Sequence, residues 1–348
     1  MKQKKISLEI LRIIAMCMVI FNHTGENGFE LFRTAHGTWL WYVAILLDVI
    51  SKAGVPVFFM ISGVLLLGKE ESIKDIFIKR ILRYAIIIVL FSFVYYIRLY
   101  IQHPEYGFSI KYFVKYIYST PFIIPYWFLY RYMSFLLLLP VLRAIALSLK
   151  EDGYLLLIGL TVFIWFSPVW EKLIGLDPIA ITNGLNVDFM LYPVIGYGIA
   201  NVISERFFNT LSRIAVFVIF IINWICSVLM NTVEYKSLGE YSGENIDRFC
   251  GIPAVVIFYF IIYLFEKKKR NISMKVSAVV TYIGSATLCV YLFEDMLRSD
   301  IFLKMFGLVS GNAAKLLMCI PYMACIVASG VVISTVLRRI PGIKLLKL

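Results

Sequence analysis

Charged residues are few in this chain. Only 16% of its 348 residues are Asp, Glu, Lys or Arg, 61% are hydrophobic, and the mean hydropathy is +0.84. A soluble globular domain carries about 25% charged and about 45–50% apolar residues. This composition excludes a soluble globule and indicates an integral membrane protein.

Histidine and cysteine are also scarce. There are three histidines, and the six cysteines include no Cys-x-x-Cys pair. Most of the cysteines fall inside apolar runs, which is typical of small buried side chains. We therefore expect no metal site, no redox site and no tightly bound cofactor.

The excess of basic residues follows the membrane pattern and does not indicate nucleic acid. The formal net charge is +12, but the basic residues fall mostly in short blocks between apolar spans. With the N-terminus in the cytoplasm, 21 of the 34 Lys and Arg residues lie on the inner side. This bias predicts that both termini are cytoplasmic, and nucleic acid is not expected as a partner.

The apolar runs predict an all-α fold, a polytopic membrane protein of about ten transmembrane helices. The second run contains Lys52-Ala53-Gly54 and is interpreted as an interfacial helix followed by a span from residue 54. No outer loop exceeds about 25 residues, so residues 1–348 are expected to form a single membrane-embedded domain. The expected spans are 7–24, 40–67, 84–101, 126–147, 153–167, 188–203, 213–230, 251–265, 278–297 and 313–337.

The first apolar run, from Leu8 to Thr24, carries an arginine and ends in a histidine. Arg12 and His23 are eleven residues apart, which on a helix places them within about 20° of each other and about 16.5 Å apart along the axis. A charge and a titratable ring on one stripe are costly in lipid. The stripe is therefore expected to face protein or water.

Two interpretations stay open for each of these residues. His23 is either a general base or an interfacial histidine satisfied by water. Arg12 either grips a phosphate or carboxylate, or snorkels to the interface and pairs with Glu9. Composition alone does not separate these alternatives.

Two further motifs lie in the second and third spans. Ser62-Gly63 is in mid-membrane, where such a pair either allows close helix packing or offers a hydroxyl to a substrate. Arg80 and Arg83 enter the third span from the cytoplasmic side, as ordinary positive-inside residues or as phosphate ligands.

Two pairs of residues fall toward the outer leaflet. Trp127 and Arg131 share a helix face and either stack or line a cavity, unless Trp127 is simply an aromatic-belt residue. Glu294 and Asp295 are adjacent acids in an apolar stretch, which is costly unless they are paired or solvated. His23 lies at the same depth, so the sequence predicts a basic inner side and an acid/base group near the outer side.

These motifs, in this order, resemble the acyltransferase-3 family of bacterial membrane proteins over nearly the whole chain. The family's Arg-x10-His pattern matches Arg12 and His23, and its Phe-Phe-x-x-Ser-Gly pattern matches residues 58–63. Its basic stretch matches Lys79-Arg80-x-x-Arg83, and Trp127-Phe128-Leu129 is similar to its fourth span. One position departs from the pattern: Glu294 stands where many members have a histidine.

The resemblance implies a multi-pass protein of the bacterial cytoplasmic membrane that transfers an acyl group, usually acetyl, from acyl-CoA to a hydroxyl of a surface or exported carbohydrate. In this interpretation Arg12, Arg80 and Arg83 bind the donor's phosphates. His23 is the base, with Glu294 or Asp295 beside it, or forms an acyl-histidine intermediate. The substrate-binding residues are Ser62, Trp127 and Arg131. Whether the protein forms a homodimer stays open.

A different class of function stays open. Some domains of the family look like permeases for small metabolites, and a polar cavity at the midplane serves transport equally well. The glutamate at position 294 slightly favours a transporter of a small metabolite such as an amino acid.

Overall fold

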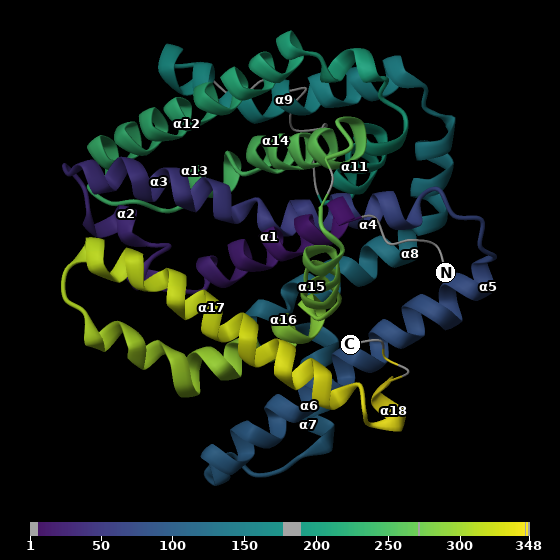
Figure 1. The fold of residues 1–348 in the computed structure, drawn as a ribbon. Coiled ribbons are helices and arrows are strands. Elements are labelled where there is room, and N and C mark those ends of the chain that lie inside the picture. Colours follow the sequence, from purple (N-terminus) through teal and green to yellow (C-terminus); the bar gives the residue numbers. More distant parts are fainter. Residues whose placement is uncertain (1–5, 177–188, 271, 345, 347–348) are drawn as a thin grey trace.

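The computed structural model describes residues 6–176, 189–270, 272–344 and 346, and every regular element in these ranges is helical (Figure 1). Seven of these helices are long and apolar enough to cross a membrane, and a bent pair brings the number to eight. The prediction of an all-helical polytopic membrane protein is confirmed.

The α-helices have the following bounds: α1 Ile6–Asn22, α2 Leu31–Thr34, α3 Trp39–Lys52, α4 Gly54–Leu66, α5 Ile73–Ile76, α6 Arg83–Gln102, α7 Ile110–Ser119, α8 Trp127–Ser148, α9 Glu151–Ile174, α11 Leu191–Asn201, α12 Thr210–Leu238, α13 Glu244–Arg248, α14 Gly251–Ile262, α15 Met274–Ser285, α16 Thr287–Leu297, α17 Asn312–Leu337 and α18 Pro341–Lys344. Short 3₁₀ and π segments join several of them, so that α5 and α6 belong to one continuous helix from Ile73 to Gln102.

The described residues contain seven or eight candidate spans instead of the expected ten, because two of the expected runs form helices shorter than a typical span of about 20 residues. The first run is α1, whose 17 residues extend about 25 Å, less than the roughly 30 Å of a hydrocarbon core. The run expected at 188–203 is α11, with only 11 residues; residue 188 lies outside the described ranges. The run at 153–167, expected to be short, belongs to the 24-residue α9.

Two helix breaks differ from the expected ones. The expected break near Lys52 is limited to Ala53, and α3 with α4 forms a single 28-residue candidate span, Trp39–Leu66. This corrects the interpretation of α3 as an interfacial helix. The run at 278–297, expected to be one span, is a pair of helices, α15 and α16, bent by 58°.

Helix ends follow local sequence signals. The side chain of Asn209 accepts a hydrogen bond from the backbone N–H of Ser212 at 2.8 Å and so caps the first turn of α12. The same helix ends at Gly239, whose φ of 75° is a left-handed conformation that favours glycine.

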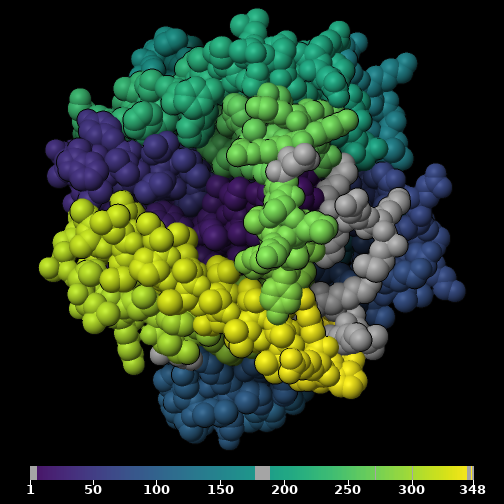
Figure 2. Space-filling view, viewed as in Figure 1, coloured from purple at the N-terminus to yellow at the C-terminus, as the bar shows by residue number. Residues whose placement is uncertain are grey.

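Helix α1 occupies the centre of the bundle. It packs against α3, α4, α15 and α17, and also touches α14 and α16. In Figure 1 it runs between the layer that contains α12 and α14 and the layer that contains α17. In the space-filling view only a small purple area of α1 is visible between the green and yellow helices (Figure 2). The stripe with Arg12 therefore faces protein, as expected from the cost of charge in lipid.

Helices α4 and α11 approach each other more closely than most helices do. A Cβ atom added to Gly63 would lie 1.9 Å from the carbonyl oxygen of Pro193, and one added to Gly196 would lie 2.5 Å from the carbonyl oxygen of Met60. Small residues allow such contact between helix backbones in a membrane. Gly63 thus has a packing role, which leaves the adjacent Ser62 free to face another side.

Candidate active site

A cavity of about 840 Å³ lies beside α1 and is lined by one face of this helix. Arg12 and Val19, which are seven residues or about two turns apart, both border it. His23 follows Val19 by four residues and comes directly after the last residue of α1, Asn22. The cavity therefore extends from Arg12 to within about one turn of His23.

Five basic side chains line this cavity, and its lining includes no Asp or Glu among the described residues. They come from four separate parts of the chain: Arg12 on α1, Lys69 after α4, Arg80 and Arg83 on the continuous helix that leads into α6, and Arg338 after α17. This collection of cations suits a ligand with several negative charges, such as a group of phosphates.

Two of the five cations, Arg12 and Arg80, each pair with a different glutamate. Arg12 donates to Glu9 Oε1 at 2.8 Å, so the expected pairing exists together with the cavity position. Arg80 binds Glu71, which also accepts a hydrogen bond from Arg143 Nη2 at 2.5 Å. Partial burial acts to raise the pKa of Glu71, but the hydrogen bonds and charges of the two arginines outweigh it and lower that pKa to about 2.

Arg83 is arranged differently from these two residues. Its Nε is buried without a hydrogen-bond partner among the described residues. Arg338 donates to the side chain and the carbonyl oxygen of Ser285 at 3.0 and 2.7 Å, next to the bend between α15 and α16. An anionic oxygen of a ligand could accept a hydrogen bond from this buried N–H of Arg83.

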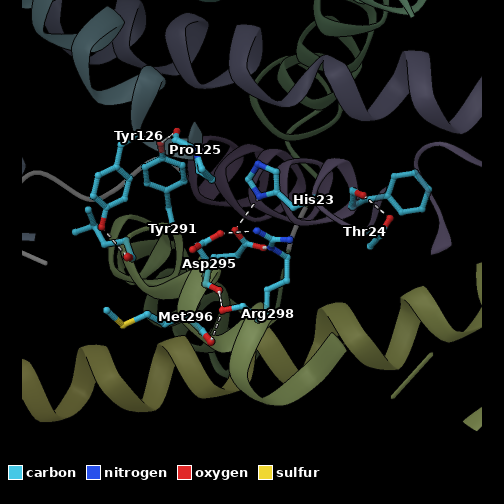
Figure 3. A network of polar contacts seen from close by, with 12 residues as sticks. His23, Thr24, Pro125, Tyr126, Tyr291, Asp295, Met296 and Arg298 are labelled. Carbon is cyan, nitrogen blue, oxygen red and sulfur yellow. Dashed lines mark hydrogen bonds and ion pairs between the residues drawn. The ribbon is translucent and has the colours of Figure 1, made fainter. Parts of the chain in front are cut away.

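His23 contacts Glu294 directly. Nδ1 of His23 lies 2.7 Å from Oε2 of Glu294, and only 1% of the Glu294 side chain is exposed (Figure 3). An ionised carboxylate only accepts hydrogen bonds, so beside an ionised Glu294 the donor is Nδ1, and in the neutral imidazole Nε2 then keeps its lone pair. The pair thus has the arrangement of a base and its orienting group.

Asp295, the neighbouring acid, does not contact His23 in this way. Its carboxylate pairs with Arg298, whose Nε also lies 3.8 Å from Oε1 of Glu294. Figure 3 shows the ring of His23 facing this acidic group, with Arg298 beside Asp295. Of the two acids expected beside the histidine, the structure places Glu294 there.

Tyrosines hold the C-terminal part of α16 in position. The hydroxyl of Tyr126 donates to the carbonyl oxygen of Leu292 at 2.8 Å, and that of Tyr95 accepts from the backbone N–H of Met296 at 3.2 Å (Figure 3). These bonds join α16 to α6 and to the start of α8 on either side of Glu294. The carboxylate is therefore fixed relative to the rest of the bundle.

The three residues expected to bind substrate are not brought together. Ser62 lines the cavity, and its hydroxyl lies 2.9 Å from the carbonyl oxygen of Phe58 and 3.3 Å from the hydroxyl of Tyr132. Trp127 and Arg131 are both exposed and lie outside this cavity, and the ring of Trp127 contacts Phe189. Their role in binding stays a prediction without support from the cavity.

Two cations of the cavity were not singled out from the sequence. Lys69 and Arg338 stand in ordinary positive-inside blocks, and no spacing relates them to Arg12. Only the packing of α17 and of the segment after α4 near α1 brings them to the same cavity. Among the described residues no cluster of His, Cys, Asp and Glu could hold a metal ion.

Comparison with family models adds a match over almost the entire chain. A model described as an acyltransferase domain, that of the acyltransferase 3 family, matches residues 5–339. The chain belongs to the acyltransferase 3 family. The resemblance drawn from its motifs is thereby confirmed, and the protein is a membrane-bound acyltransferase. Searches of curated proteins and of solved structures gave no match.

Membership in the acyltransferase 3 family gives the cavity a context. An acyltransferase needs room for an acyl donor and for an acceptor, and a group that activates the acceptor. The cavity supplies the room and the cations, and the His23–Glu294 pair lies about one turn beyond its last α1 residue.

Proposed function

We propose that this acyltransferase moves an acyl group, acetyl in the simplest case, from cytoplasmic acyl-CoA to a hydroxyl of a carbohydrate that is exported or displayed on the bacterial surface. One observation carries the proposal: a cavity lined by five cations follows the face of α1 toward a histidine–carboxylate pair. The polyanionic end of coenzyme A and its long, mostly uncharged arm match these two features.

In this proposal the donor's phosphates lie among the cations of the cavity. Arg80 and Arg83 are at the start of the continuous helix that leads into α6, and Arg12 is about two turns from Val19. The arm that carries the thioester then runs past Val19, Phe58 and Ile61, toward His23. These apolar side chains exclude water from the thioester, which favours transfer over hydrolysis.

The transfer step uses His23 as a general base. Nε2 of His23 takes the proton of the acceptor hydroxyl while the oxygen attacks the thioester carbonyl; the C–S bond then breaks, and the thiolate of coenzyme A takes the proton. Glu294 keeps the proton of the resting imidazole on Nδ1 and stabilises the imidazolium that forms. The alternative acyl-histidine route uses the same nitrogen as nucleophile.

The test is transfer of a labelled acetyl group from acetyl-CoA in membranes that contain the full chain. We expect His23→Ala to abolish transfer while the protein stays folded and still binds coenzyme A. Arg12→Ala should mainly raise the KM for the donor, since it removes a cation from the cavity without touching the base. Wild-type activity in His23→Ala would contradict the assignment of the base.

The transporter alternative has its own outcome in the same preparation. Uptake of a small metabolite into proteoliposomes without any acyl donor, combined with no binding of coenzyme A, would contradict the proposed donor and favour transport. If labelled acetyl-CoA leaves its acetyl group bound to His23 before any acceptor is added, the reaction follows the covalent route and not direct transfer.

A further inference from the structure

Behind the His23–Glu294 pair, three buried polar atoms have no hydrogen-bond partner among the described residues. The first is Oε1 of Glu294, the carboxylate oxygen that does not face His23. The second is Nε of Arg298, which lies 3.8 Å away, too far for a direct hydrogen bond. A buried carboxylate oxygen beside an unpaired N–H is an unfavourable arrangement unless another group joins them.

The third atom is the hydroxyl oxygen of Tyr322 on α17. Its side chain is completely buried, and α17 packs along α16. Tyr322 packs in one buried cluster with Val290 and Leu297, the residues that lie four before and three after Glu294 on α16, and its hydroxyl interacts electrostatically with Glu294 and Arg298. Two helices therefore direct three polar atoms without partners toward the same place.

We propose that one buried water molecule joins Oε1 of Glu294, Nε of Arg298 and the hydroxyl of Tyr322, and that Tyr322 acts through it as a positioning residue for the proposed base. The inference rests on the proposed function for its catalytic meaning. The water site itself rests only on the three atoms.

The hydrogen-bonding capacity of the three atoms fits one water. The water accepts from Nε of Arg298, donates to Oε1 of Glu294 and makes its third bond with the hydroxyl of Tyr322. Three bonds are typical of a buried water. Two hydrogen bonds of about 2.8 Å span the 3.8 Å between Nε and Oε1 with an angle of about 85° at the water oxygen.

The consequence concerns the charge of Glu294. Donors that reach a carboxylate favour its ionised form, and an ionised Glu294 accepts the Nδ1 proton of His23. Without the Tyr322 contact, the His23–Glu294 pair would hold a proton more tightly, so the base would already be protonated in less acidic solution than in wild type. The other polar and titratable groups that interact with this site are Asp295 and Tyr291 on α16, Tyr95 on α6 and Cys319 on α17.

The test compares Tyr322→Phe with wild type by NMR titration of His23 in the full chain, in detergent or nanodiscs. There are only three histidines, so the signal can be assigned with single His→Gln variants of His36 and His103. We expect the titration midpoint of His23 to move to higher pH by about one unit. The acidic limb of kcat should move in the same direction, with the donor KM unchanged within about twofold.

Tyr154→Phe is the matched control. Tyr154 is as deeply buried as Tyr322, but it lies on α9 and donates to the carbonyl oxygen of Ala146 at 2.7 Å. It should lose some thermal stability and leave the His23 titration unchanged. If Tyr322→Phe does not fold, Arg298→Gln should move the midpoint in the same direction.

The outcomes are separable. An unchanged His23 midpoint in Tyr322→Phe, or a high-resolution density map without a water between these atoms, would overturn the inference. If wild-type protein transfers no acyl group but the midpoint still moves, the water site stands and the proposed function fails.

Discussion

His23 and Glu294 are 271 residues apart in the sequence, and their side chains meet at 2.7 Å. Glu294 occupies the position at which many proteins with similar motifs have a histidine. The contact shows what the carboxylate can do there: it accepts a proton from Nδ1 and leaves Nε2 available. In the proposed mechanism, Glu294 at this position gives His23 a carboxylate as its orienting group.

Removing the charge of Glu294 should slow the chemistry more than it weakens binding. We expect Glu294→Gln to lower kcat about tenfold to hundredfold, because an amide stabilises the imidazolium less and a positioned base contributes about 10²–10⁴-fold. Labelled acetyl transfer at saturating donor measures it. Asp295→Asn, one residue away but paired with Arg298, should lose less. An equal loss in both would show that contact with His23 does not matter.

Restoring the histidine tests the same position from the other side. We expect Glu294→His to retain activity, since a neutral imidazole can also accept the proton of Nδ1. The measurement is the same acetyl transfer, with thermal unfolding as a folding check. Complete loss of activity in a folded protein would mean that the carboxylate has acquired a role that an imidazole does not fill.

Arg83 should contribute to donor affinity because its buried Nε has no hydrogen-bond partner in the described part of the chain. Loss of a charge-assisted hydrogen bond typically weakens binding about tenfold to hundredfold, so Arg83→Gln should raise the KM for acetyl-CoA by about that factor with little change in kcat. Lys79→Gln is the control: Lys79 is nearby but exposed, pairs with Asp75 and lies outside the cavity. A similar rise in both variants would indicate general attraction instead of a site.

The close approach of α4 and α11 predicts that a glycine-to-alanine substitution lowers stability at Gly63 but not at Gly159. Gly63→Ala places a Cβ 1.9 Å from a backbone oxygen, so the helices must separate, at a cost of about 1–3 kcal/mol. Gly159→Ala is the matched control, because the added Cβ meets nothing within 4 Å in the middle of α9. It should be neutral or stabilising by about 0.5–1 kcal/mol. Thermal unfolding in detergent measures both, and equal effects would contradict the packing account.

The bridge from Glu71 to Arg80 and Arg143 should make stability depend on pH. The pKa of Glu71 is lowered from its ordinary value of 4.5 to about 2 in the folded protein. Its contribution is therefore fully present above about pH 4.5 and is lost as the pH falls toward 2. We expect Glu71→Gln to unfold at a lower temperature than wild type at pH 7, with the difference shrinking at pH 3. A difference that does not depend on pH would exclude the charge as its cause.

The sequence by itself was sufficient for the class of protein and for part of the site. Its apolar runs predicted an all-helical membrane protein, and the spacing of Arg12 and His23 placed both on one face of α1. These properties are local, since hydropathy and helical periodicity depend on near neighbours in the chain. The number of candidate spans differs from the expected number because apolar runs do not fix the length of the helix that forms, which is 17 residues for α1 and 11 for α11.

Tertiary structure decided which distant residues share the site. Nothing in the sequence selects Glu294 over Asp295 as the partner of His23, or adds Lys69 and Arg338 to the cations around Arg12. These choices depend on the rotation of α16 and on the packing of α17 beside α1, which arise from side-chain contacts between segments far apart in the chain. The motif on α1 is local, whereas its partners are set by the fold.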